Sequence, residues 1–107
     1  MGQDEAPDRV PWAIPPTALG AWQVLQAKLE QVGGDVPCRT TDDVSAWWPD
    51  KRDLTSPATY GAVTACRRCA PRGPCAEYAI AADERFGVWG ATVPEQRRTA
   101  RLAARTF

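Results

Sequence analysis

Apolar residues between positions 17 and 32 recur at steps of three and four, which is the spacing of one face of an α-helix. Gly33 and Gly34 follow, and glycine commonly ends a helix. We therefore predict a helix over residues 17–32 whose apolar face packs on the rest of the domain, with Trp22 also a candidate for display at the surface. The apolar positions are Leu19, Trp22, Leu25, Leu29 and Val32.

Local start and stop signals mark four more helices. Ser56-Pro57 is a cap followed by proline at the first helical position, and Thr92–Glu95 matches a capping box. Pro49 ends a short helix that Thr41 or Asp42 caps, and Gly87 closes the segment that begins at Pro74. The chain therefore reads as all-α, a small bundle of about four to five short helices. The later helices are predicted over residues 42–47, 57–69, 74–86 and 92–107.

Residues 1–16 differ from the rest, being acidic and then rich in proline, as is typical of a flexible N-terminal arm. Trp12 lies in this arm and either folds back on the core or anchors a partner. Residues 17–107 suffice for a single domain, with a core over 37–91 and a basic C-terminal helix over 92–107. A core of this size is marginal, so a bound metal centre would supply needed stability.

The net charge is zero, but the positive charge gathers in the second part of the chain. Residues 66–107 carry eight arginines and four acidic residues, a net charge of +4 (8 − 4). No apolar run approaches the ~20 residues of a membrane span, and we see no secretory signal. We therefore expect a cytoplasmic protein with reduced cysteines.

Four cysteines carry the candidate chemistry. Cys66, Cys69 and Cys75 form a C-x2-C-x5-C pattern, and Cys38 lies 27 intervening residues upstream. Four thiolates around one centre suit either a structural zinc ion or an iron–sulfur cluster. Arginines between the ligands would offset the negative charge of such a centre; these are Arg67, Arg68 and Arg72.

Other uses of the cysteines stay open at this level. They could form two disulfides, a thioredoxin-type redox motif, or unrelated buried small side chains. The chain has no histidine, so a mixed Cys/His zinc finger is excluded. The spacing matches neither a zinc ribbon with two CxxC knuckles nor the bacterial and plant ferredoxin patterns.

Two aromatic positions are candidates for contact with a partner. Trp47 and Trp48 are adjacent, and side chains of adjacent helical residues point about 100° apart, so both are hard to bury. Val88 and Trp89 lie between two glycines in a tight turn. The alternative to partner contact is that Trp89 only shields the core.

An arginine stripe follows on the last predicted helix. Arg97, Arg101 and Arg105 recur every four residues, and Arg98 lies beside them. Such a stripe is either a solvated face or a surface that binds phosphate, which arginine pairs with well.

The combined pattern resembles one family, the WhiB-like transcription regulators of actinobacteria and their phages. The resemblance covers roughly residues 37 to 100. It rests on Cys38 with C-x2-C-x5-C, the segment AEYAI, the turn Gly87-Val88-Trp89-Gly90 and the closing Glu95-Gln96-Arg97-Arg98. The family usually has a second glycine where this chain has Ala91, and Phe-Phe-Pro where it has Trp-Trp-Pro.

The resemblance implies one [4Fe-4S] cluster per chain, held by Cys38, Cys66, Cys69 and Cys75. It also implies that the turn and its tryptophan contact the C-terminal region of the principal sigma factor of RNA polymerase, and that the C-terminal helix reaches promoter DNA. The implied partner-binding residues are Trp47, Trp48, Val88 and Trp89. The implied DNA-binding residues are Arg97, Arg98, Arg101 and Arg105.

We therefore predict a redox-responsive transcriptional regulator without catalytic residues or a small-molecule substrate. The alternative is a structural four-cysteine zinc module that mediates interactions and would need the same ligands. A protein disulfide reductase acting through the CxxC thiols in the apo form is a third class, but no histidine and no nucleophile–base pair supports it.

Overall fold

The computed structural model describes residues 14–106, with residues 104–106 described by their backbone alone. Trp12 and most of the predicted N-terminal arm lie outside the described residues. Within them the chain forms five α-helices and three short 3-10 helices and no strand, so the predicted small all-α fold is confirmed. The α-helices are α1 (Leu19–Gln31), α2 (Pro37–Thr40), α3 (Pro57–Arg67), α4 (Arg72–Ala81) and α5 (Pro94–Thr106). The 3-10 helices are η3 (Pro16–Ala18), η4 (Val44–Trp47) and η5 (Lys51–Asp53).

Several helix ends follow the signals read from the sequence. α1 ends before Gly33 and Gly34, whose φ angles are 64° and 78°. Ser56 caps α3 by accepting a hydrogen bond from the Thr59 N–H at 3.2 Å. The helix predicted over 42–47 is the 3-10 helix η4, and α2 has no counterpart among the predicted helices.

The end of α4 differs from the prediction, which continued this helix to residue 86. Asp83 adopts a left-handed conformation with φ 55°. Its N–H donates to the Ile80 carbonyl at 3.1 Å, and the Glu84 N–H donates to the Ala79 carbonyl at 2.9 Å. This pair of bonds is the Schellman motif, usually closed by glycine, with aspartate in its place. The helix therefore stops five residues early, at Ala81.

The capping box of α5 is formed by residues other than the predicted Thr92 and Glu95. The Thr92 hydroxyl donates to the Trp89 carbonyl at 2.6 Å and is not free to cap the helix. Gln96, one position beyond Glu95, accepts a hydrogen bond from the Val93 N–H at 3.0 Å. The cap is therefore displaced by one residue, because the preceding turn already uses the threonine.

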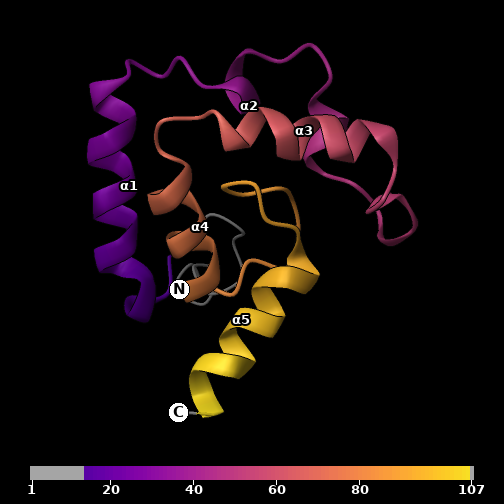
Figure 1. Cartoon of the computed structure of the whole chain (residues 1–107). Helices are drawn as coiled ribbons and strands as arrows, with labels where there is room; N and C mark the ends of the chain where they lie inside the picture. The colour runs from indigo at the N-terminus through magenta and orange to yellow at the C-terminus, as the bar shows by residue number, and fades with distance from the viewer. Residues whose placement is uncertain (1–13, 107) are drawn as a thin grey trace, which may run out of the picture.

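The helices surround two small clusters of buried side chains. α1 packs along α4, and the two lie side by side in Figure 1, with Leu25 and Tyr78 buried between them. α3 crosses the other end, where Trp47, Ala62 and Cys66 form the second cluster. α5 extends away from the remaining helices (Figure 1) and meets the end of α4.

The segment from Gly87 to Thr92 is a closed turn between α4 and α5. Trp89 and Thr92 exchange backbone hydrogen bonds at 2.9 and 3.0 Å. Gly87 has φ 86°, and a Cβ there would lie 2.6 Å from the Trp48 ring, so this position requires glycine. The Val88 N–H donates to the Trp47 carbonyl at 2.8 Å. The turn is therefore fixed to η4 by both backbone and ring contacts.

Candidate metal centre and contact surfaces

The four cysteines line one cavity of about 260 Å³. Cys38 comes from α2, Cys66 from the last turn of α3 and Cys75 from the first turn of α4. Cys69 lies in the connection after α3, where its N–H donates to the Cys66 carbonyl at 3.0 Å. The helix predicted over 57–69 therefore ends two residues early, and Cys69 lies in a turn beyond it. Cys75 lies in the first turn of α4, next to Pro74, where the helix was predicted to begin.

The thiols influence one another electrostatically. Burial, followed by the neighbouring Cys66, raises the pKa of Cys38 and of Cys69. Burial and the three other cysteines raise the pKa of Cys75 to about 12, although the Gly90 N–H, which donates to its sulfur, lowers it. All four are free thiols. A metal bound in the cavity would displace their protons, since thiolate is the metal ligand.

The donor set suits either a single zinc ion or a cluster of several metal ions. A tetrahedral zinc ion with ~2.3 Å bonds would hold its four sulfurs about 3.8 Å apart. Four thiolates are also the ligand set of a [4Fe-4S] cluster. In the part of the chain that the structure describes, no three cysteine or carboxylate side chains are already grouped around one ion. The cysteines surround a space of about 260 Å³, and a bound metal centre would lie there.

Only one of the two adjacent tryptophans is at the surface. Trp47 is 8% exposed and packs with Ala62 and Cys66, whereas Trp48 is 52% exposed. Val88 is buried in the same cluster as Trp47. Trp47 and Val88, both predicted to contact a partner, therefore lie in the core beside Cys66 and not on the exposed surface.

We call Trp48, Phe86 and Trp89, which lie in or beside the turn, the aromatic patch; Trp48 and Phe86 are exposed, whereas Trp89 is partly buried and packs on the cluster that contains Tyr78. The Trp48 and Trp89 rings meet edge to face with centroids 6.4 Å apart. The Trp89 indole N–H donates to the Phe86 carbonyl at 3.0 Å, and Phe86 is 72% exposed. Phe86 was not among the predicted partner-binding residues. Its position immediately before the turn at Gly87 was the feature of the sequence that could have indicated it. Trp22, in contrast, packs on Tyr78 with centroids 5.1 Å apart.

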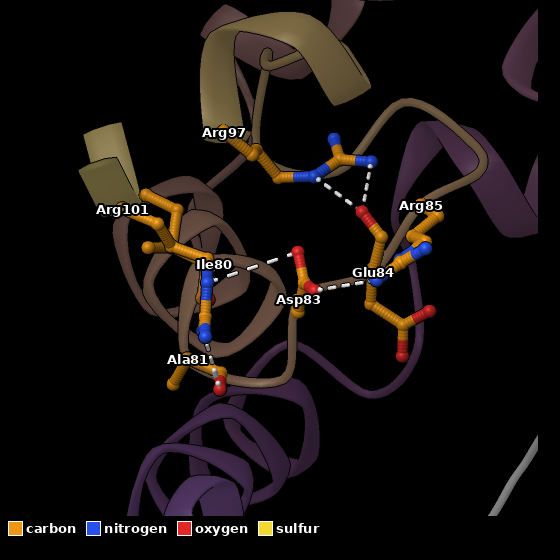
Figure 2. A network of polar contacts seen from close by, with 7 residues as sticks. All are labelled: Ile80, Ala81, Asp83, Glu84, Arg85, Arg97 and Arg101. Atoms are coloured by element: carbon orange, nitrogen blue, oxygen red, sulfur yellow. Dashed lines mark hydrogen bonds and ion pairs between the residues drawn. The ribbon is translucent and has the colours of Figure 1, made fainter. Parts of the chain in front are cut away.

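Arg97 does not face solvent. Its side chain is 1% exposed, and its guanidinium donates to the carbonyl oxygens of Glu84, Phe86, Gly87 and Thr92 at 2.7 to 3.3 Å. Figure 2 shows the guanidinium directed at the Glu84 carbonyl. Burial lowers the pKa of Arg97, yet an arginine stays charged in proteins. The structure therefore places Arg97, a predicted DNA contact, inside the fold, where backbone carbonyls use its donors.

Arg101 is also engaged in the fold. It donates to the Ile80 and Ala81 carbonyls at 2.9 and 3.3 Å, and its Nε lies 3.7 Å from Asp83 Oδ1 (Figure 2). Both carbonyls lie at the C-terminal end of α4, where the helix dipole is negative, so the cation stabilises this terminus. Its side chain remains partly exposed.

The remaining arginines are distributed unequally over the surface. Of the predicted DNA contacts, Arg98 is exposed, while the side chain of Arg105 lies outside the description. A second set of exposed arginines lies on α2, at the end of α3 and at the start of α4. The sequence predicted three of them, Arg67, Arg68 and Arg72, only to balance the charge of the metal centre. This set consists of Arg39, Arg67, Arg68 and Arg72.

Comparison with known proteins gives a consistent result. A family described as "Transcription factor WhiB" matches residues 34–100. The transcriptional regulator WhiB2 of Mycobacterium tuberculosis is 35% identical over 94 residues, which cover 88% of this chain and 89% of that protein. The transcriptional regulator WhiB of Streptomyces coelicolor is 40% identical over 67 residues, covering 63% and 71%.

The transcriptional regulator WhiB2 of Mycolicibacterium smegmatis is 41% identical over 61 residues, which cover 57% of this chain and 43% of that protein. No solved structure matches the chain. None of the helices in the described residues has both the length and the apolar character needed to cross a membrane.

Proposed function

This chain belongs to the WhiB family of transcription factors, and from that membership we propose that its four cysteines hold a [4Fe-4S] cluster through which it regulates transcription. The observation that carries the proposal is the single cavity of about 260 Å³ lined by Cys38, Cys66, Cys69 and Cys75. The ligands come from α2, α3, α4 and the connection between the last two.

The cysteines have two tasks in this function. They tie α2 to the α3–α4 pair, which stabilises a small domain with two separate hydrophobic clusters. When bound, the cluster would supply sensitivity to oxidants or to nitric oxide. The thiols that its loss releases lie around one cavity, so they can pair as disulfides and report the redox state of the cell.

The aromatic patch is proposed to dock on the C-terminal region of the principal sigma factor. Trp48 and Phe86 expose about half and about three quarters of their surface, at 52% and 72%. Tryptophan is enriched among residues that dominate binding energy. The identity of the partner follows from the family resemblance, and the proposed cellular location is the cytoplasm, where RNA polymerase acts.

Promoter DNA is proposed to lie beside the bound polymerase, within reach of exposed arginines. Such contacts to phosphate position a protein but do not read bases. Sequence choice is then left mainly to the polymerase holoenzyme, and this chain adds affinity nearby. With Arg97 inside the fold, Arg98 is the exposed cation that the first two turns of α5 offer to DNA.

The test is the composition and colour of protein purified without oxygen. We expect iron and acid-labile sulfide, broad absorption in the visible, and loss of all three on replacement of any of the four cysteines by alanine. Colourless protein with stoichiometric zinc would overturn the cluster and favour the structural zinc module.

Binding to sigma factor is tested separately, by co-purification of the cluster-loaded protein with the C-terminal region of sigma. The expected result is a complex that survives removal of DNA. Absence of a complex with an intact cluster would refute the proposed partner while leaving the metal centre in place.

A further inference from the structure

We propose that the phosphate backbone of promoter DNA lies against the place where α2, the end of α3 and the start of α4 meet, which we call the arginine corner. The arginine corner consists of Arg39, Arg67, Arg68 and Arg72, and its side chains are all exposed. α2 packs on α3, so Arg39 belongs to the same end of the molecule as the other three (Figure 1). The inference rests on the proposed function in taking promoter DNA as a partner and the cluster-loaded, sigma-bound chain as the form that binds it.

The charge of the arginine corner is not neutralised within the fold. In the described part of the chain, none of its four guanidinium groups donates a hydrogen bond or pairs with a carboxylate. No acidic residue occurs between Asp53 and Glu77, a segment that contains Arg67, Arg68 and Arg72. Exposed arginines without an internal partner keep all their donors for an external anion.

α5, the segment first predicted to bind DNA, is different in this respect. Arg97 gives its donors to four backbone carbonyls, and Arg101 caps the end of α4 and pairs with Asp83. Glu95 adds a negative charge to the first turn of this helix. The arginine corner is therefore the largest group of exposed, unpaired arginines in the described residues, while Arg98, Lys51 and Arg52 lie elsewhere.

The surroundings of the arginine corner suit nucleic acid better than an acidic protein. Protein interfaces have an apolar centre rich in aromatic residues. The exposed residues beside the arginines are small, namely Ala70 and Gly73, and would let a sugar–phosphate chain approach closely. The nearby tryptophans, Trp22, Trp48 and Trp89, lie on the inner side of the corner, where they line the cysteine cavity together with Arg39 and Arg72. On the outer side, around Arg67 and Arg68, the nearest exposed aromatic residue of α3 is Tyr60, seven residues before Arg67 and about 10 Å away along the helix.

Charge compensation of the metal centre is the competing role, and the structure separates the two. Arg39 and Arg72 line the cysteine cavity, whereas Arg67 and Arg68 do not. Replacement of Arg67 and Arg68 therefore changes the outer part of the arginine corner and leaves the cavity lining intact. Lys51 and Arg52 provide a matched control, because they are also adjacent, exposed and cationic but lie on η5.

The experiment is a salt titration of binding between the cluster-loaded chain, in complex with the C-terminal region of sigma, and a fluorescent DNA duplex of arbitrary sequence. Each lost phosphate contact reduces the slope of log K against log salt by about 0.9. We expect Arg67→Gln with Arg68→Gln to flatten the slope by up to about two units. Lys51→Gln with Arg52→Gln should leave the slope unchanged, and Arg67→Lys with Arg68→Lys should retain most of it.

Equal slopes for the wild type and the Arg67, Arg68 double variant would overturn the proposal, as would equal flattening in both glutamine variants. Loss of visible absorption in the double variant would assign these arginines to the metal centre, and loss of sigma binding would assign them to a protein contact. If the wild-type complex binds DNA no more tightly than the C-terminal region of sigma alone, the DNA part of the proposed function fails as well. The other outcomes leave the DNA part of the proposed function unaffected.

Discussion

Replacement of Arg97 by alanine should destabilise the fold far more than the same change at its neighbour Arg98. Arg97 is 1% exposed and bridges the end of α4, the turn and the start of α5, whereas Arg98 is exposed. Both changes remove one positive charge from adjacent positions of one helix. The pair therefore separates the internal role of the guanidinium from any general effect of charge.

The magnitude follows from the acceptors that Arg97 serves. Its bond to the Gly87 carbonyl, at 3.0 Å, is buried, and those to the Glu84, Phe86 and Thr92 carbonyls are partly buried. The Phe86 and Thr92 carbonyls also accept hydrogen bonds from the indole and backbone N–H groups of Trp89, so the change leaves the Gly87 and Glu84 carbonyls without a donor. A buried carbonyl left without a partner costs about 1–3 kcal/mol, and the partly buried Glu84 carbonyl recovers some energy from water. The sum is about 2–4 kcal/mol, a large fraction of the 5–15 kcal/mol typical of a domain.

Thermal unfolding followed by circular dichroism, on protein purified without oxygen, measures the effect. We expect Arg97→Ala to lower Tm by more than about 10 °C, and Arg98→Ala to stay close to the wild type. Arg97→Lys should lie between them, since an ammonium keeps the charge but cannot reproduce the fork of five donors. If Arg97→Ala and Arg98→Ala unfold at the same temperature, the internal role of Arg97 is refuted.

Three further changes test other parts of the molecule. Cys38→Ala should lose iron and sulfide and unfold at a lower temperature, because α2 is then untied; full iron content would exclude Cys38 as a ligand. Trp48→Ala should weaken sigma binding by about 2 kcal/mol or more in a titration while visible absorption is retained, and unchanged affinity would remove Trp48 from the interface. Ala91→Gly should raise the free energy of unfolding by about 1 kcal/mol in urea, because Ala91 has φ 68°. Ala100→Gly, on the exposed side of α5, should lower the free energy of unfolding by about as much. A change in the same direction for both glycine variants would contradict the conclusion that Ala91 is conformationally strained.

Local signals in the sequence were sufficient for most helices and for the grouping of the cysteines. Ser56-Pro57 and Gly33-Gly34 act through neighbouring backbone groups, so they could be read without knowledge of the tertiary structure. The cysteine spacing likewise limits how far apart Cys66, Cys69 and Cys75 can lie. The early end of α4 was missed because aspartate at position 83 takes a conformation that glycine usually provides.

The roles of the arginines and of the tryptophan pair could not be predicted, because they depend on backbone carbonyls and packing partners that only the tertiary structure brings close. Arginines at four-residue steps are predicted to share one face of a helix. The spacing does not show whether backbone carbonyls from other segments lie against that face and accept their hydrogen bonds, as they do for Arg97. The same limit applies to Trp47 and Trp48. Their adjacency shows that they diverge, but which one is buried is decided by the packing of α3 and the turn.

The hydrogen bond from the Gly90 N–H to the Cys75 sulfur has a mechanical consequence. A charged acceptor forms a hydrogen bond about twice as strong as a neutral one, so a metal-bound thiolate and a free thiol hold the turn with different force. The difference is on the order of 1 kcal/mol, and it acts one residue away from Trp89. Metal binding or loss at Cys75 would therefore change how firmly the backbone of the turn is held beside Trp89, through a single hydrogen bond.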